Sequence, residues 1–422
     1  MMGEFRLPEE VWIHVFTFLS IHDKLSARCS CRLFRRLIDC PVLWKNTTLC
    51  IEKINSFTCH NWRTLRNRKI QSVVVLKTRS SEWRQLALRL PWIQSVTVDV
   101  CCSTSLNSLP EFTNLTRLVL RRCVCPSLTS LSALHDLSHL SLCEVVSAST
   151  SDIIQALSQL TNLTSLHYHD YKNQIPPAEF RHLLQRLPKL KHLSWNLRPR
   201  SINHLYKDAL FVPEDPQYRM PALVSLELLN YEVPILSPVA LQGLTSLRLL
   251  TVQYKGHLEP HQWPIQTWLS QMPLLSELNI SLGYQLGVYA NSVPPTVHRL
   301  SLKGVRADFN ALRVLAQRVP DLLHLHLDLC FHNIQSLIAE IPQLFPKLQS
   351  LAIRQYKLPA EEFLGLAQLP HLNYLVILDP SVGPNSALMD LTEKMHIQTN
   401  YRVNVVPFSR PKHPYACHCA NY

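Results

Sequence analysis

The segment LTRLVLRRC, residues 115–123, contains the pattern that decides the fold of this chain. Its apolar residues Leu115, Leu118 and Leu120 are separated first by two residues and then by one. Apolar residues two apart lie on one face of a strand, so the segment predicts a short strand that is buried on that face. The pattern recurs every 22 to 33 residues, with first apolar positions at Ile70, Ile93, Leu115, Leu137, Leu163, Leu190, Leu223, Leu247, Leu275, Val297, Leu322, Leu348 and Leu372.

The segments between these strands have the apolar spacing of helices. Apolar residues three and four apart recur in 151–160, 177–187, 308–319, 333–341 and 359–369. Proline lacks an N–H and disfavours helical backbone in the residue before it, so it ends a helix at a fixed place. A proline stands two residues before the first apolar position at Pro91, Pro188, Pro221, Pro273, Pro295, Pro320, Pro346 and Pro370.

A period of this size with this apolar pattern indicates leucine-rich repeats. One repeat cannot bury its strand face alone, whereas stacked neighbours bury it together. We therefore expect an α/β horseshoe with parallel strands on the concave face and helices outside. We place about 13 repeats at 69–410. A short all-helical module precedes them at 1–48, a linker helix or first repeat cap lies at 49–68, and 411–422 forms a flexible tail.

Composition and charge fit a folded protein with acidic partners. Of 422 residues, 46% are apolar and 17% are charged, and the net charge of +12 favours acidic or phosphorylated proteins, nucleic acid or anionic membranes. Eight Lys and Arg residues between Trp62 and Arg89 face one acid, Glu82, and we interpret them as a solvated basic surface rather than a dedicated binding site. Nucleic-acid binding has less support, since the chain lacks a known reading motif and aromatic residues arranged for stacking bases.

The cysteines and the N-terminal residues favour an intracellular protein, cytoplasmic or nuclear. Thirteen cysteines without regular spacing are typical of reduced thiols. The residues before the apolar stretch 11–21 are mainly acidic and no small-residue cleavage site follows it, so we expect no secretion signal. No other segment approaches the roughly 18 apolar residues of a membrane span. A secreted recognition protein stays open as an alternative because of four N-x-S/T sequons, at Asn46, Asn114, Asn162 and Asn279.

The residues between and beside the apolar strand positions are predicted to face the concave surface, where repeat proteins bind partners. Our candidates for substrate binding are Arg117, Arg121, His139, His167, His169, His192, His324 and His326. Further residues at such positions are Glu227, Glu277, Arg299, Lys303, Asp328 and Arg354.

Four of these histidines lie on successive predicted strands, which are about 4.8 Å apart. His139, His167, His169 and His192 are therefore candidates for a metal site or a pH-sensitive contact. A polar concave face that uses histidine for size and hydrogen bonding accounts for them as well, and we predict no metal or cofactor. Two departures from the repeat period, 198–221 and 282–296, are either binding loops or idle insertions.

No catalytic motif is present, and we expect a protein that is not an enzyme. The chain lacks G-x-x-x-x-G-K-[ST], G-x-G-x-x-G, H-E-x-x-H and G-x-S-x-G. Near the C-terminus, His413, Cys417, His418 and Cys419 are close in sequence, but a single short cluster is a weak zinc signal. We interpret it as an unliganded tail.

The stretch LPEEVWIHVFTFLS, residues 7–20, predicts a helix with Pro8 at its start and two acidic residues in its first turn. Val11, Trp12, Val15, Phe16, Phe18 and Leu19 cover an arc of about 160°, whereas an ordinary surface helix needs about 100°. About fifty residues form a marginal core by themselves. We therefore expect a small helical module that binds another protein through its excess apolar surface.

Residues 7–44 resemble the F-box family. Leu7-Pro8, Glu10, Ile13, Phe16, Leu19, Asp23, Leu25, Cys31-Arg32 and Trp44 match family positions in order, whereas Lys24, Ser30 and Phe34 depart from the pattern. With the repeats, the whole chain is similar to the F-box and leucine-rich-repeat family. The resemblance implies adaptor-contact or module-core roles for Leu7, Pro8, Ile13, Phe16, Leu19, Leu25, Cys31, Arg32 and Trp44.

The resemblance also implies a substrate-recognition subunit of an SCF (Skp–cullin–F-box) ubiquitin ligase. The F-box would bind the Skp adaptor, and through it the cullin and the RING subunit. The repeats would hold a protein substrate for ubiquitination and proteasomal degradation. The basic residues Arg117 and Arg121 suggest an acidic or phosphorylated substrate. A leucine-rich-repeat scaffold for protein–protein interaction without ligase activity is the alternative.

Overall fold

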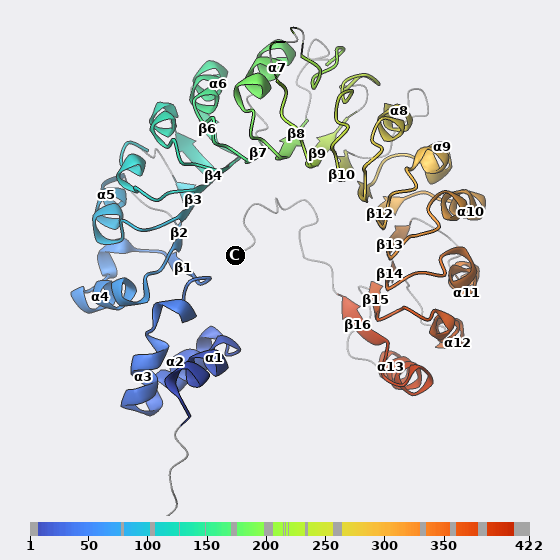
Figure 1. Ribbon diagram of the computed structural model, residues 1–422, viewed down its shortest axis with the longest axis horizontal. Coiled ribbons are helices and arrows are strands. Elements are labelled where there is room, and N and C mark those ends of the chain that lie inside the picture. The colour runs from blue at the N-terminus through green and yellow to red at the C-terminus, as the bar shows by residue number, and fades with distance from the viewer. Residues whose placement is uncertain are drawn as a thin grey trace, which may run out of the picture. The chain divides into compact units, whose positions relative to one another are not determined.

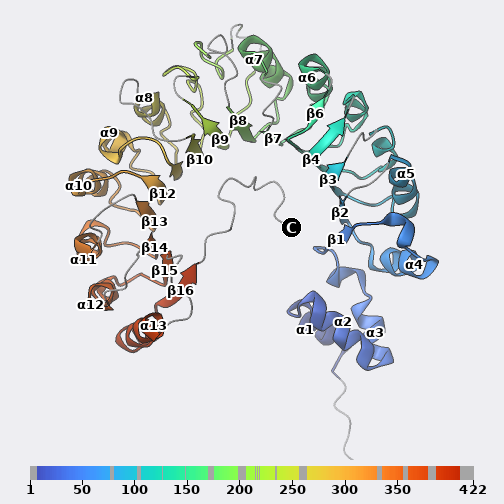
Figure 2. The same ribbon diagram turned by 180° about the vertical axis from the view of Figure 1, so that it is seen from behind.

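In the computed structural model the chain forms two compact units, divided between Leu163 and Thr164. In each unit, parallel strands line the inner side of an arc and the helices that connect them lie on its outer side (Figures 1 and 2). The structure describes residues 7–76, 80–101, 106–125, 127–147, 149–169, 175–197, 206–213, 215, 217, 219–232, 235–255, 264–329, 335–354, 360–378 and 386–408.

The first unit begins with three helices and continues as a parallel sheet. The opening elements are α1 (Glu9–Thr17), α2 (Ile21–Ser30), α3 (Arg32–Ile38) and the 3-10 turn η1 (Pro41–Leu43). The strands β1 (Thr48–Ile51), β2 (Ser72–Leu76), β3 (Ser95–Cys101), β4 (Arg117–Cys125) and β5 (His139–Cys143) pair in chain order, and β6 (Val146–Ser147) pairs with β4. The connecting segments contain η2 (Ile54–Ser56), α4 (Cys59–Arg68), α5 (Ser80–Arg89), η3 (Leu109–Glu111), η4 (Thr129–Ala133) and α6 (Thr150–Ser158).

The second unit repeats the same arrangement. Its strands, parallel and paired in chain order, are β7 (Ser165–His169), β8 (His192–Asn196), β9 (Ser225–Tyr231), β10 (Leu249–Tyr254), β11 (Glu277–Ser281), β12 (Arg299–Val305), β13 (His324–Leu329), β14 (Ser350–Arg354), β15 (Tyr374–Leu378) and β16 (Asn404–Phe408). Its return segments contain α7 (Pro177–Arg186), α8 (Pro264–Ser270), α9 (Leu286–Tyr289), η6 (Ala290–Ser292), α10 (Phe309–Arg318), α11 (Gln335–Leu344), α12 (Ala360–Leu364), η7 (Gly365–Gln368) and α13 (Ser386–Thr399).

The predicted strand repeat is confirmed. Every phrase with the apolar pattern forms a strand that begins two residues after its first apolar position, as β4 begins at Arg117 after Leu115. The first apolar side chains of all the phrases are 0 to 2% exposed, since they turn in beneath the sheet and pack against the neighbouring repeats. The mixed α/β repeat architecture therefore follows from one recurring apolar pattern.

The return helices lie where the apolar spacing placed them. The segment 177–187 forms α7, which ends at Arg186 directly before Leu187 and the predicted stop at Pro188. Asp308 caps α10, because its carboxylate accepts the N–H of Ala311 over 2.7 Å. One prediction needs correction: 359–369 is not a single helix, since α12 gives way to the tighter turn η7 at Gly365.

Three strands were missed: β1 and β16 at the two ends of the repeat series, and the two-residue β6, which pairs with β4. β1 pairs with β2, and β16 pairs with β15, although neither segment has the full apolar phrase. The sheet thus begins at Thr48, so the segment 49–68 contributes most of a strand and the helix α4 to the repeats. The expected tail, 411–422, lies outside the described residues.

The two departures from the period are only partly irregular. The stretch 282–296 contains α9 and η6 and serves as a short return segment. In 198–221, the first described residue, Tyr206, bridges to Leu236, and its hydroxyl donates to the carbonyl of Ile175 over 2.5 Å. Its ring also lies 5.0 Å from that of Trp195, so this part of the loop packs against β8 within the second unit.

Among the helices that the structure describes, none is long and apolar enough to cross a membrane.

Candidate functional site

The three N-terminal helices pack around a small aromatic core. The ring of Phe16 on α1 lies 5.0 Å from that of Phe34 on α3, in an edge-on arrangement, and Trp12 lies 4.7 Å from Phe34. Leu37 and Ile38 on α3 are also buried. Aromatic pairs at these distances stabilise a core beyond their buried area. The helices therefore hold together through one side of α1.

The other side of α1 presents apolar side chains to solvent. Val11, Val15 and Phe18 are exposed, and their spacing of four and three residues places them on one helix face. Phe18 is 77% exposed, while Phe16, two residues earlier, is 2% exposed. Further exposed apolar side chains of this module are Leu7, Ile21, Leu25, Leu33 and Val42. The excess apolar surface expected from the sequence is thus present on the structure.

An ion-pair cluster joins this module to the first repeat helix. Asp39, which follows α3, accepts from Nη2 of Arg28 over 2.9 Å and from Nε of Arg68 on α4 over 2.9 Å. The guanidinium of Arg68 also lies 3.8 Å above the ring of Trp44, whose indole N–H donates to the carbonyl of Ile38. Arg68 is buried. The carboxylate of Asp39 contacts one side of its guanidinium, and the ring of Trp44 covers the other side.

The pKa values in this cluster follow from burial and pairing. Partial burial by itself would raise the pKa of Asp39, but hydrogen bonds from Arg28 and Arg68 outweigh burial and lower it below its ordinary value. The hydrogen bond to Asp39 raises the pKa of Arg28. Burial lowers the pKa of Arg68, and its hydrogen bond to Asp39 opposes this effect.

On the strand-lined face of the first unit, the predicted basic residues are partly neutralised. Asp99 on β3 is buried and accepts from Nη2 of Arg122 over 2.8 Å, and Nη1 of Arg121 lies 3.8 Å from its other oxygen. Arg117 is half-buried, and burial lowers its pKa. The register places Arg117 beside His139, which is also half-buried. The positive charge of Arg121 is thus balanced within its own face, which weakens the argument for an acidic substrate.

The second unit brings two of the four predicted histidines together with a carboxylate. His167 and His169 on β7 have ring centres 5.9 Å apart, and ligand atoms of His167, His169 and Glu227 all lie within 4.8 Å of one another. His192 on β8 is exposed and is not part of this group. His139 belongs to the first unit.

The participation of Glu227 was not predicted, although the sequence contained a signal for it. In the aligned phrases LTSLHYH, LKHLSWN and LVSLELL, the residues His167, Ser194 and Glu227 occupy the same position. The strand register confirms this alignment, since His167 pairs with Ser194 and Ser194 pairs with Glu227. Alignment by repeat position, rather than by residue type, would have found the group.

Further along the second unit, His324 and His326 lie on β13 and are half-buried. Burial lowers the pKa of His324, and the neighbouring charge of Arg299 adds to this effect while Glu277 opposes it. His326 stands beside Ser301 and Ala352 in the register. Two other residues expected on the concave surface are buried in an ion pair instead, because Nη2 of Arg354 donates to Asp328 over 3.0 Å.

The comparison with protein families decides the nature of the helical module. Residues 5–50 match the F-box-like family model. The chain joins an F-box-like domain to leucine-rich repeats. No curated protein sequence matches the chain.

Several solved structures are similar in arrangement at low sequence identity. An internalin (InlF) from Listeria monocytogenes is 17% identical, with 83% of this chain and 89% of that chain covered and a TM-score of 0.43. A TLR13–ssRNA13 complex is 18% identical, with coverage of 87% and 55% and a TM-score of 0.45. The ectodomain of the Arabidopsis thaliana receptor kinase GASSHO1/SCHENGEN3, in complex with CASPARIAN STRIP INTEGRITY FACTOR 2, is 15% identical, with coverage of 86% and 43% and a TM-score of 0.38.

The structure sorts the nine F-box positions into core and surface. Phe16 and Trp44 are buried, Ile13 and Leu19 are half-buried, and Leu7, Pro8, Leu25, Cys31 and Arg32 are exposed. The first group forms the F-box core, and the last group is available to a partner. α1 begins at Glu9, one residue later than expected, with Pro8 directly before it.

Two departures from the F-box pattern have a structural explanation. Lys24 is buried, and its ammonium lies 3.4 Å from the carbonyl of Leu43, so it ties α2 to η1. Phe34 stands where the family usually has tryptophan and contacts both Trp12 and Phe16. Neither departure disrupts the packing of the F-box.

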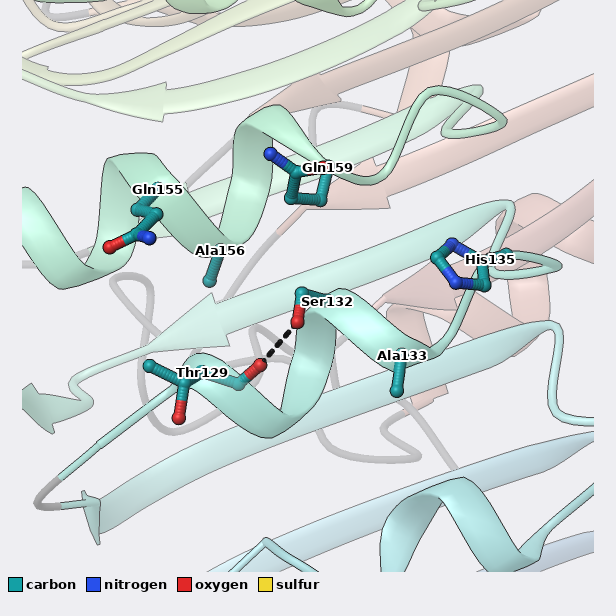
Figure 3. A pocket seen from close by; sticks show the side chains of 7 residues that line it. All are labelled: Thr129, Ser132, Ala133, His135, Gln155, Ala156 and Gln159. Carbon is teal, nitrogen blue, oxygen red and sulfur yellow. Dashed lines mark hydrogen bonds between the residues drawn. The ribbon is translucent and has the colours of Figure 1, made fainter.

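A pocket of about 460 Å³ lies on the return-segment side of the first unit (Figure 3). It opens between η4 and α6 and is lined by Thr129, Ser132, Ala133, His135, Gln155, Ala156 and Gln159. The hydroxyl of Ser132 donates to the carbonyl of Thr129 over 2.6 Å. The short side chains of Ala133 and Ala156 leave this space open, and the other lining residues surround it with hydroxyl, amide and imidazole groups.

Proposed function

We propose that this chain is the substrate-recognition subunit of an SCF-type ubiquitin ligase. Its F-box binds the Skp adaptor and, through it, the cullin and the RING subunit. Its repeats hold a protein substrate for ubiquitination and proteasomal degradation in the cytoplasm or nucleus. The observation that supports this proposal most directly is the exposed apolar face of α1 within a domain that matches the F-box-like model.

The exposed side chains of this apolar face can contribute to the affinity of a partner. Burial of one Val or Phe side chain contributes about 1.5–3 kcal/mol. Val11 and Val15 are 40% exposed and Phe18 is 77% exposed, so a partner that covers them gains part of this amount from each valine and most of it from the phenylalanine. Aromatic anchors near the centre of an interface commonly dominate its affinity, and Phe18 has the greatest exposed fraction among the large apolar side chains that the structure describes in the F-box.

The junction between the F-box and the repeats supports a role in positioning the substrate. Arg68 on α4 is held by Asp39 and by the ring of Trp44, both from the F-box segment. A fixed connection would hold a substrate lysine near the ubiquitin-carrying subunit at high effective concentration. In this proposal the chain itself performs no bond-making step, and the other ligase subunits carry the chemistry.

The strand-lined faces of the two units are the proposed substrate-binding surfaces. They combine buried ion pairs, such as Asp328–Arg354, with half-buried polar side chains, including His324 and His326. Such a face is suited to a folded or extended protein surface with mixed polarity. The charge compensation at Asp99 favours recognition by hydrogen bonding and shape over recognition of a strongly acidic segment.

Co-purification with the Skp adaptor tests the proposal. The double variant Val15→Asp/Phe18→Asp should lose the adaptor, and Leu7→Ala/Pro8→Ala should recover less of it. Leu88→Asp is a matched control, since Leu88 is 67% exposed on α5 outside the F-box, and it should bind normally. The proposal is wrong if the intact chain recovers no adaptor or if the two F-box variants recover as much as the intact chain.

A second measurement separates the ligase role from that of a scaffold. When the proteasome is blocked, the intact chain should capture specific proteins that carry ubiquitin. A chain that lacks residues 1–48 should capture the same proteins without ubiquitin. Adaptor binding without any captured protein whose half-life changes on depletion would instead support the non-ligase scaffold.

A further inference from the structure

The row formed by His167, Ser194 and Glu227 brings metal-binding side chains together on adjacent strands. The register pairs His167 of β7 with Ser194 of β8, and Ser194 with Glu227 of β9. Ser194 is the smallest member and lies in the middle, so the longer side chains on either side can converge above it. His169 lies two residues further along β7 and therefore points to the same face as His167.

The hydrogen bonds around Ser194 hold the group in place. The hydroxyl of Ser194 donates to a carboxylate oxygen of Glu227, and Nε2 of His169 lies 2.7 Å from the same hydroxyl. Since that hydroxyl has one hydrogen, its oxygen accepts from His169. The hydroxyl of Ser165 lies 3.2 Å from Nε2 of His167. His169 and Ser194 are each 3% exposed, whereas His167 and Glu227 are half-buried.

We propose that His167, His169 and Glu227 bind a divalent transition-metal ion with the coordination chemistry of zinc. Zinc takes imidazole nitrogen and carboxylate oxygen at about 2.0–2.2 Å in tetrahedral geometry, which sets its ligand atoms about 3.4 Å apart. The three ligand atoms lie within 4.8 Å of one another, so rotation of the side chains brings them into range. The serines at positions 165 and 194 then act as hydrogen-bonding partners that orient the ligands.

The ligand atoms of the proposed site, two imidazole nitrogens and one carboxylate oxygen, favour some metal ions over others. Two imidazoles disfavour calcium and magnesium, which prefer oxygen ligands throughout. Three protein ligands leave one position of a tetrahedral ion for water or for a donor from a bound protein. Because the site lies on the strand-lined face of the second unit, a bound protein could supply that donor. The metal site itself does not depend on the ubiquitin-ligase role.

The chain contains a second histidine pair that provides a matched control. His324 and His326 on β13 have the same spacing as His167 and His169 and are half-buried, as His167 is, but Arg299 stands beside His324. The pKa of His324 is lowered by burial and by that cation. Among the described residues, these two are not part of any group of three metal-binding side chains.

Calorimetric titration of the full-length protein with Zn²⁺, after treatment with a chelator, tests the proposal. The wild-type chain should bind one equivalent in the strand-face site, and His167→Ala and Glu227→Gln should each weaken that affinity at least about tenfold. His326→Ala and Cys417→Ser/Cys419→Ser should leave it unchanged. Equal affinities in wild type and Glu227→Gln, or no zinc binding by the wild type, would overturn the proposal.

Cobalt spectroscopy identifies the ligands independently of affinity. Co²⁺ in this site should give tetrahedral ligand-field bands without sulfur-to-metal charge transfer, because its ligands are nitrogen and oxygen. Charge-transfer bands that disappear in Cys417→Ser/Cys419→Ser would place the metal in the tail and contradict the proposal. Glu227→Gln keeps the shape of the side chain, and an unchanged circular dichroism spectrum would show that lost binding does not reflect unfolding.

Discussion

Arg68 of the first repeat helix donates from Nε to Asp39 of the F-box segment over 2.9 Å. Asp39 lies before the first repeat and Arg68 lies in it, so the contact joins the F-box segment to the repeats. Arg28 donates to the same carboxylate, and Trp44 covers the other side of the Arg68 guanidinium. Because Asp39 is shared by α2 and α4, it couples the F-box to the repeats.

Substitution of Arg68 should therefore destabilise the first unit. Arg68→Leu removes a charged hydrogen bond and leaves Asp39 with Arg28 alone, so we expect a loss of about 2 kcal/mol in the free energy of unfolding. Urea denaturation measures this quantity. Arg36→Leu is the control, since its pair with Glu9 is exposed and should cost at most about 1 kcal/mol. Equal losses in both variants would contradict a special role for the junction.

The same carboxylate predicts how stability depends on pH. Pairing lowers the pKa of Asp39 in the folded chain, so the folded state binds this proton less readily than the unfolded state. The stabilisation is fully present above about pH 4, the unfolded value, and is lost as the pH falls through the lower folded pKa. Unfolding free energies measured across this range should show a smaller acid-induced loss in Asp39→Asn. An unchanged pH profile in that variant would exclude this contribution.

Phe16 and Phe18 should respond to substitution in opposite ways. Phe16→Ala removes a buried ring and should cost about 3–5 kcal/mol of stability. Phe18→Ala should change stability by less than about 0.5 kcal/mol, because its ring is exposed, but should weaken adaptor binding at least about tenfold. Thermal unfolding and a titration with purified Skp adaptor measure the two effects. Unchanged adaptor affinity in Phe18→Ala would remove Phe18 from the proposed interface.

Gly283 and Gly365 provide a paired test of the repeat backbone. Gly283 has φ +87°, and a Cβ at this position would collide with the ring of Tyr254. Gly283→Ala should therefore destabilise the second unit by about 1–3 kcal/mol. A Cβ at Gly365 meets no atom within 4 Å, so Gly365→Ala should be neutral or stabilise by up to about 1 kcal/mol. Thermal unfolding of both variants checks the sign of each effect.

The apolar phrase predicted the repeats well because it is a local signal. The spacing of Leu115, Leu118 and Leu120 recurs in every predicted repeat, and each segment with this spacing forms a strand. The terminal strands β1 and β16 were missed because an end repeat has a neighbour on one side only and needs fewer apolar positions. The excess apolar surface of residues 7–20 was likewise visible in the sequence, but its division into buried Phe16 and exposed Phe18 required the packing of α3 against α1.

The sequence by itself determined the order of helices and strands, the positions that face the core and the resemblance to an F-box. These depend on spacing within a few residues, which is the range over which helices and strands repeat. Only the tertiary structure decided which charges pair and which histidines meet a carboxylate. Asp39 of the F-box segment reaches Arg68 of the first repeat helix, and His167 of β7 reaches Glu227 of β9, because packing sets residues from separate strands and helices side by side. Such contacts depend on the register between elements, and register is fixed when the chain packs.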